Sequence, residues 1–429
     1  MELESSAMAR VMRRLVPLLV LGYFVAYIDR VNLGVAALTM NKDLGFSQTV
    51  LGLGAGIFFA GYFFFEVPSN LLLHKFGARR WIARIMLSWG VISGCMALIQ
   101  GETSFYIVRL LLGVAEAGFF PGVILYVTLW FPAAYRGRVI GLFAMALPLS
   151  GIIGNPVSAA LLGMNGVAGL AGWQWLFIIE AIPSVILAFF VLRHLTDRPQ
   201  DATWLPPDER AWLIGRLARE QREQEVVHRH SIAEAMFKPS VLLLALVYFG
   251  TGANGYGLSF FLPQIVKELG LTNLQTGFVS AIPFVFAAVG TIWWGRRSDR
   301  TGERHMHAVI AYAVAGLGMI AAAALPNPYL RMVAISFGAL GTFASIPVFW
   351  SLPTAFLSGV AAAAGIAVIN ALGNTAGFFA PYAIGYLRDL TGGFSAGLMA
   401  IGLSALLSAA IVLLMRQAPS TRTTLPTRA

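Results

Sequence analysis

The sequence predicts an all-α integral membrane protein, with twelve transmembrane helices arranged in two six-helix halves. Of its 429 residues, 58% are hydrophobic and only 12% are charged, whereas soluble domains carry about 25% charged residues. The apolar runs have the length of helices and lack the ~10-residue alternation of an outer-membrane β-barrel. One long polar segment divides the runs into two sets of six, and this predicts the two halves.

The expected spans are runs of about 20 or more mostly apolar residues, the length that crosses a bilayer as a helix. They lie at about 15–40, 50–73, 80–100, 104–130, 138–162 and 172–193, and then at about 241–266, 274–296, 305–325, 329–352, 362–387 and 394–416. The predicted domains are an N-terminal bundle at 1–193, a linker at 194–240 and a C-terminal bundle at 241–429.

Local signals refine three of these elements. Ser47 is placed to cap the second span, and the prolines and acids at 206–210 predict a short helix in the linker. The seventh span is rich in glycine from Gly250 to Gly257, and we expect it to be broken there because glycine weakens a helix interior.

Basic residues gather in the loops after the second, fourth, eighth and twelfth spans. They are Lys75, Arg79, Arg80, Arg84, Arg136, Arg138, Arg296, Arg297, Arg300, Arg304, Arg416, Arg422 and Arg428. The positive-inside rule then predicts a multi-pass protein of the inner (cytoplasmic) membrane, with both termini and the linker in the cytoplasm. This distribution accounts for the net charge of +10, and we expect no nucleic acid partner.

The motifs of other function classes are absent from the sequence. It contains no HExxH, nucleophile elbow, P-loop or intramembrane histidine cluster, which argues against an enzyme. The single cysteine, Cys95, excludes an intrachain disulfide and a thiolate metal cluster. We therefore expect a monomer without metal or cofactor, apart from the proton as coupling ion, whose partners are the bilayer and a small solute.

Several segments carry a resemblance to a known family. The loop at 295–304 resembles the Gly-x-x-x-Asp-Arg-x-Gly-Arg-Arg signature of the major facilitator superfamily and keeps Asp299. The corresponding loop of the first half departs from it, with Asn70 and His74 where glycine and aspartate are usual. Further shared segments are Tyr-Ile-Asp-Arg-Val-Asn at 27–32, Glu-Val-Pro-Ser-Asn at 66–70, 109–121, Trp-Gln-Trp-Leu-Phe at 173–177, and 197–205. The chain is similar in these to the anion:cation symporter family, which implies the major facilitator fold and alternating access.

Four charged residues deep in the spans need an explanation, because each costs roughly 2.5–3.5 kcal/mol at the bilayer centre. Asp29 and Arg30 are adjacent in the first span, whereas Arg109 and Glu116 are seven residues apart in the fourth and share a helix face. Guanidinium groups stay charged and bind carboxylates, whereas buried carboxylates exchange protons. We predict that Arg30 and Arg109 bind an anion and that Asp29 and Glu116 couple transport to protons, as the resemblance also implies. The alternative is a static brace, and Arg30 could instead lock the first helix to a neighbour.

The second half has no carboxylate or arginine at mid-depth, so it can offer a substrate only neutral groups. The candidates for substrate contact are Asn254, Tyr256, Asn370 and Asn374, together with Tyr62 of the first half, where the resemblance places a substrate-contacting tyrosine. Amides and hydroxyls suit a hydroxylated substrate, although buried amides also hydrogen-bond between helices. Phe349 and Trp350 could equally line a site for an aromatic acid.

Charged residues near the cytoplasmic loops are predicted to form gating contacts. They are Glu66, Arg79, Arg80, Asp299 and Arg300. For Arg79 and Arg80 the alternative is that they supply only the positive charge that orients the chain.

Together these predictions describe a secondary active transporter, a proton-coupled symporter for the uptake of a small organic carboxylate. The resemblance implies sugar acids, tartrate or aromatic acids, and a hydroxylated or sugar-derived acid is our first expectation. The alternatives are an aromatic-acid symporter and an anion uniporter or exchanger without proton coupling.

Overall fold

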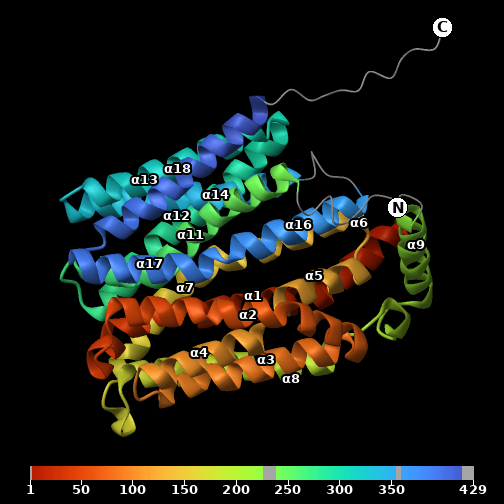
Figure 1. Ribbon diagram of the computed structural model, residues 1–429. Coiled ribbons are helices and arrows are strands. Elements are labelled where there is room, and N and C mark those ends of the chain that lie inside the picture. The colour runs from red at the N-terminus through yellow and green to blue at the C-terminus, as the bar shows by residue number, and fades with distance from the viewer. Residues whose placement is uncertain (1, 226–237, 354–358, 418–429) are drawn as a thin grey trace.

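The computed structural model describes residues 2–225, 238–353 and 359–417, and the regular structure in these ranges is entirely helical (Figure 1). The first half contains α1 (Glu2–Leu44), α2 (Gln48–Phe76), α3 (Ala78–Cys95), α4 (Glu102–Glu116), α5 (Phe119–Trp130), α6 (Ala133–Ala144), α7 (Ala146–Leu161) and α8 (Gly172–His194), and the linker contains α9 (Pro207–Glu225). The second half contains α11 (Pro239–Lys267), α12 (Asn273–Thr301), α13 (His305–Ala324), α14 (Pro328–Phe349), α16 (Gly359–Asn374), α17 (Ala376–Thr391) and α18 (Ser395–Gln417). Short 3-10 turns lie at Met96–Leu98, Leu162–Met164, Val167–Gly169 and Pro199–Asp201.

The predicted all-α membrane fold is confirmed. Among the described residues, 11 helices or pairs of consecutive helices are long and apolar enough to cross a membrane. The remaining expected span corresponds to α16 and α17, which are separated at Thr375 and are not among these 11. The predicted cap is also confirmed, since the Ser47 side chain accepts a hydrogen bond from the Val50 N–H.

The linker helix α9 packs against the first half at the end of the bundle that carries the N terminus, which we call the linker end (Figure 1). Its Glu209 accepts hydrogen bonds from Ser6 and Arg10 of α1, and its Glu220 accepts one from the backbone of Ala133 in α6. These contacts explain why α1 begins at Glu2 and not near residue 15. The polar first turns have partners on α9, so the helix does not depend on lipid there.

The two halves pack most closely at the opposite end, which we call the far end. There α2 runs along α17, and the two backbones approach each other at glycines. A Cβ added at Gly52 would lie 2.3 Å from the carbonyl oxygen of Pro381, and one at Gly56 would lie 2.7 Å from that of Phe378. No side chain fits into such a gap, so these glycines allow the far end to close.

Asp389 of α17 adds a polar contact to the same seam. Its carboxylate accepts hydrogen bonds from the backbone N–H groups of Gln48 and Thr49 at 3.1 and 2.7 Å, and from the Thr49 hydroxyl at 2.6 Å. The first N–H groups of a helix have no partner within the helix. Asp389 therefore caps α2 from the other half of the molecule.

The seventh span is not broken, contrary to expectation. α11 is continuous across its glycines, and none of them has a positive φ. Three of the four serve close packing instead: a Cβ at Gly250 would lie 2.2 Å from the hydroxyl oxygen of Ser408, one at Gly252 2.9 Å from Ala376, and one at Gly257 2.7 Å from Ile384.

The break in the first half comes in the fourth span. Gly118 has φ +85°, a left-handed conformation that favours glycine, and it separates α4 from α5. Ser69 of α2 fills the space where a Gly118 side chain would project, 2.3 Å from the ideal Cβ position. Glu116 is consequently the last residue of α4.

Candidate functional site

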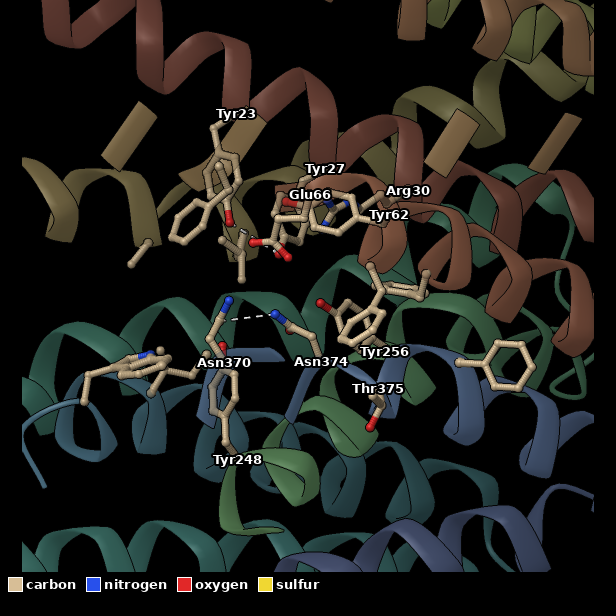
Figure 2. Close-up of a pocket in the computed structure, with 18 of the residues that line it drawn as sticks. Tyr23, Tyr27, Arg30, Tyr62, Glu66, Tyr248, Tyr256, Asn370, Asn374 and Thr375 are labelled. Carbon is tan, nitrogen blue, oxygen red and sulfur yellow. Dashed lines mark hydrogen bonds between the residues drawn. The ribbon is translucent and has the colours of Figure 1, made fainter. Parts of the chain in front are cut away.

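A cavity of about 430 Å³ lies between the two halves, on the linker-end side of the seam. Figure 2 shows Arg30, Tyr62 and Glu66 on one side of it and Tyr256 and Asn374 on the other. The wall is mainly aromatic and aliphatic. Among the described lining residues, Arg30 and Glu66 are the two charged ones, and both belong to the first half.

Arg30 forms a buried ion pair with Glu116 and also faces this cavity. The guanidinium carbon lies 4.8 Å from the ring centre of Tyr27, 5.3 Å from that of Phe58 and 5.5 Å from that of Tyr62. Nε of Arg30 is buried without a hydrogen-bond partner. The positive charge is thus held by one carboxylate and several aromatic faces, and it keeps a free donor for a further acceptor.

Arg109 does not line the cavity, although it was expected to bind the anion there. Its side chain is 1% exposed, its Nε donates to the Gly54 carbonyl at 3.1 Å, and its guanidinium lies 5.0 Å from the Phe58 ring centre. The reason is helix packing. A Cβ at Gly113 would lie 2.0 Å from the Phe58 carbonyl oxygen, so α4 lies directly behind α2 and Arg109 faces α2.

Asp29 lies outside the cavity lining, on another face of α1 from its neighbour Arg30. Its carboxylate accepts hydrogen bonds from Trp89 Nε1 at 2.8 Å, Ser93 Oγ at 3.1 Å and Ser184 Oγ at 3.0 Å. These donors come from α3 and α8. Since successive residues of a helix point about 100° apart, α1 presents Asp29 to these two helices and Arg30 to α4.

A second buried carboxylate, Glu180 of α8, lies against the next polar residue of α1. It accepts hydrogen bonds from Asn32 Nδ2 at 2.9 Å and Ser158 Oγ at 2.6 Å. These bonds join α1, α7 and α8, so Glu180 braces three helices of the first half.

Four of the five neutral candidates line the cavity: Tyr62, Tyr256, Asn370 and Asn374. Asn374 donates to Asn370 at 3.2 Å, and the Tyr256 ring lies 4.4 Å from the Phe59 ring of the other half. Asn254 lies elsewhere, because its amide donates to the Ile401 carbonyl at 2.9 Å and ties α11 to α18. The shared face of Asn370 and Asn374 is therefore as the spacing predicted, whereas Asn254 points away from the cavity.

The expected gating residues do not contact one another in this conformation. The Arg79 N–H donates to Asp197 at 2.8 Å, and Asp299 pairs with Arg304 at 2.6 Å in its own loop. Arg80 and Arg300 are exposed. Glu66 faces the cavity.

Two aromatic lining residues of α1 were not singled out from the sequence. The hydroxyls of Tyr23 and Tyr27 are 3.5 Å apart, and both rings face the cavity. Their spacing in the sequence could have identified them, because one face of a helix carries residues four and three apart such as Tyr23, Tyr27 and Arg30. Tyr248 of α11 also lines the cavity and stacks on Phe349 at 5.2 Å.

Comparison with known proteins identifies the family. The model described as Major Facilitator Superfamily matches residues 19–381 and 244–429. A "Putative tartrate transporter" of Agrobacterium vitis is 52% identical over 97% of this chain and 96% of its own. A "Quinolone resistance transporter" of Acinetobacter baumannii is 44% identical over 93% and 92%, and the "Inner membrane transport protein RhmT" of Escherichia coli is 41% identical over 94% of each chain.

Solved structures show the same fold. An inward-facing, occupied bacterial homolog of the human lysosomal transporter Spinster has a TM-score of 0.76 at 17% identity, covering 94% of this chain and 96% of its own. The xylose transporter XylE from E. coli, in an inward open conformation, has a TM-score of 0.73 at 16% identity, covering 95% and 97%. The chain therefore belongs to the Major Facilitator Superfamily and is a multi-pass membrane transporter, not an enzyme.

Proposed function

We propose that this protein is a secondary active transporter that takes up a small organic carboxylate together with protons. The observation that carries the proposal is the buried pair of Arg30 and Glu116 at the wall of a cavity between the two halves. Arg30 is the one arginine or lysine among the described lining residues. A substrate carboxylate can replace Glu116 on the guanidinium, which binds carboxylates through two parallel hydrogen bonds.

Protonation of Glu116 supplies the coupling in this mechanism. While Glu116 is ionised it neutralises Arg30, and an incoming anion has to compete with it. A proton on Glu116 removes this competition, so the proton and the substrate bind in the same state. When the proton leaves, Glu116 pairs with Arg30 again and the anion is released.

Asp29 is the second proposed proton carrier. It lies beside the Arg30 position on α1, and its hydrogen bonds from Trp89, Ser93 and Ser184 tie α1 to α3 and α8. A change of charge at Asp29 alters these ties and thereby the position of α1, which also holds Arg30. The proton is the only coupling ion that this mechanism requires.

Alternating access follows from the contrast between the two ends of the bundle. The cavity lies on the linker-end side of the α2–α17 seam. Gly52 and Gly56 of α2 pack against α17, and residues further along the same helix, between Phe59 and Glu66, line the cavity. With the linker in the cytoplasm, this conformation faces inward. The proposed unit is a monomer in a bacterial inner membrane, since the three relatives reported above are bacterial.

Hydroxylated or sugar-derived acids are the proposed substrates. Asn370, Asn374 and the cavity tyrosines offer hydrogen bonds to hydroxyl groups opposite Arg30. The relative whose printed name contains tartrate, a dicarboxylic acid with two hydroxyl groups, supports this class.

An aromatic carboxylate is the second candidate. The rings of Phe59, Phe120, Phe343, Trp350 and Phe378 contribute to the cavity wall, and aromatic pairs add stabilisation beyond the area that they bury. The relative named for quinolone resistance favours the same class, because quinolones are aromatic carboxylic acids.

Uptake into proteoliposomes tests the proposal. The purified protein is screened by thermal shift against tartrate-like, sugar-derived and aromatic acids, and labelled forms of those that stabilise it are offered under imposed gradients. We expect accumulation that needs an inward proton gradient. Saturable uptake that ignores pH and membrane potential would exclude symport and favour a uniporter or exchanger. No saturable flux of any carboxylate would overturn the proposed function itself.

A further inference from the structure

A side pocket of about 70 Å³ adjoins the main cavity, and most of its lining belongs to the second half, with Tyr27, Val31 and Leu147 contributed by the first. We call it the annex and define it by Gly255 and Ser259 of α11 and Thr342 of α14. Tyr256 and Asn374 line both the annex and the main cavity, so the two spaces meet at these residues. Arg30 lies across the cavity from Tyr256 and Asn374 (Figure 2), so a molecule held at Arg30 can extend past these two residues into the annex.

The annex exists because one residue of α11 has no side chain. A Cβ added at Gly255 would meet no atom within 4 Å, and the backbone there is ordinary right-handed helix. Helix packing and backbone conformation therefore do not require a glycine at this position. What the glycine leaves is open space at the wall of a cavity, where neighbouring glycines of α11 instead touch other helices.

The floor of the annex presents hydrogen-bond acceptors. Ser259 Oγ donates to the Gly255 carbonyl at 2.8 Å, and Thr342 Oγ1 donates to the Gly338 carbonyl at 2.9 Å. A hydroxyl has a single hydrogen, so each of these groups turns only its lone pairs toward a ligand. The described lining of the annex includes no charged residue. The annex therefore suits a neutral hydroxyl group, and it disfavours a carboxylate because a buried charge without a partner of opposite charge is costly.

The size of the annex fits a small terminal group. One water molecule needs about 10–15 Å³ of space measured in this way, and the annex offers about 70 Å³. A hydroxymethyl or hydroxyethyl group fits this space.

We propose that the annex is a subsite for the hydroxyl-bearing tail of the transported acid. This inference rests on the proposed function, in which Arg30 holds the carboxylate on the opposite side of the cavity. The annex sets the length of acid that the site accepts. Among acids long enough to reach it, the annex also selects those that end in a hydroxymethyl group, such as gluconate, over acids of equal length that end in a second carboxylate, such as glucarate.

The first experiment fills the annex and measures the length preference. Unlabelled glycolate, glycerate or gluconate competes with a labelled acid chosen by thermal shift. Its uptake is measured in proteoliposomes that contain wild type, Gly255→Val or the matched control Gly141→Val. Valine is a better helix former than glycine, and Gly141 of α6 also has no atom within 4 Å of its Cβ position but lines neither space. We expect Gly255→Val to weaken competition by gluconate about tenfold or more, on the scale of one or two lost hydrogen bonds. Competition by the short acids and the behaviour of Gly141→Val should stay as in wild type.

The second experiment tests the acceptor floor with Ser259→Ala combined with Thr342→Val. Both changes remove a hydroxyl with little change in size. We expect the preference for gluconate over glucarate to fall several-fold while competition by glycerate is retained.

The outcomes separate this inference from the proposed function. If gluconate competes equally in wild type and Gly255→Val, no tail enters the annex and the inference is wrong, although the protein still transports carboxylates. Loss of all three acids in Gly255→Val, with Gly141→Val intact, would place the annex on the common path and also contradict a tail subsite. If none of the acids competes in wild type, the proposed substrate class fails and the inference fails with it.

Discussion

Arg30 and Glu116 lie 86 residues apart in the chain and form a buried ion pair that joins α1 to α4. Removing one partner of such a pair typically costs about 3–5 kcal/mol, because the other is left as an uncompensated buried charge. The pair also faces the cavity between the halves through Arg30. Its state therefore depends both on what occupies the cavity and on whether Glu116 carries a proton.

Glu116→Gln should abolish accumulation driven by a proton gradient but preserve exchange of substrate across the membrane. Glutamine has the shape of the protonated acid and no ionisable group, so Arg30 stays available to the anion and no proton is carried. The measurement compares gradient-driven uptake with counterflow in the same proteoliposomes. Wild-type accumulation by this variant would show that Glu116 is not the coupling acid.

Removal of Arg30 and removal of Arg109 should differ in their effect on substrate binding. Arg30→Ala should weaken substrate binding by about 10- to 100-fold, since hydrogen bonds to charged groups contribute roughly 1.5–3 kcal/mol. Arg109→Ala should lower the melting temperature, by on the order of 5 °C, because it removes a buried side chain packed on Phe58 and bonded to Gly54. It should nevertheless retain substrate binding, since Arg109 does not line the cavity.

Ligand-induced thermal shift and the melting temperature without ligand measure both effects on the same samples. The reverse result, with binding lost in Arg109→Ala and kept in Arg30→Ala, would restore the expectation that Arg109 contacts the anion in transport.

Asp29→Asn should leave substrate affinity within about threefold of wild type and strongly reduce proton-driven transport. The residue does not line the cavity, so binding is not affected directly. An asparagine amide also places an NH₂ group where one of the two carboxylate oxygens stood, so it loses the acceptor either of Ser93 or of Trp89 and Ser184. Ser88→Ala, which removes a hydroxyl bonded only to its own helix at Ile85, is the matched control on α3. A large loss of affinity in Asp29→Asn would contradict the separation of the two acids.

Asp389→Ala should loosen the far end. The change removes the three hydrogen bonds that cap α2 from α17, and loss of a helix cap costs about 0.5–2 kcal/mol. Spin labels on cysteines at Lys42 and Gly393, in a Cys95→Ala background, report the far-end distance by electron paramagnetic resonance. We expect a larger population of long distances than in wild type.

Arg388→Ala is the control for the change of charge. Arg388 lies beside Asp389 but pairs with Glu268, which belongs to the same half. Its removal should leave the distance distribution unchanged. Equal opening in both variants would mean that a change of charge opens the far end and that the cap on α2 does not hold it closed.

The sequence was informative about the fold because a bilayer imposes simple constraints. Every backbone polar group in lipid must be paired within a helix or a closed barrel, so long apolar runs translate directly into helices such as α8 at Gly172–His194. Local signals were also reliable where they act over a few residues, as in the Ser47 cap. The glycines of α11 were misjudged because glycine has two uses, and only the neighbours decide between a break and a close approach.

The residues of the candidate site were recognised more easily than their partners. Asp29, Arg30, Arg109 and Glu116 stood out because charge is rare in membrane helices. Their spacing suggested that Arg109 and Glu116 act together, yet Glu116 pairs with Arg30 and Arg109 faces α2. Likewise Asn254 was expected at the cavity together with its near neighbour Tyr256, but its side chain forms a hydrogen bond between α11 and α18.

The sequence alone thus determined the class of protein, the number of spans and the inventory of charges, because each depends on composition and on the fixed rise of a helix. The tertiary structure decided which of these charges reach the cavity. That outcome depends on glycines such as Gly113, whose missing side chain lets α4 lie directly against α2 and carries Arg109 away from the cavity. It also depends on the turn at Gly118, which ends α4 at Glu116, the residue that meets Arg30. Approaches of this kind join residues far apart in the chain, and no local pattern in the sequence encodes them.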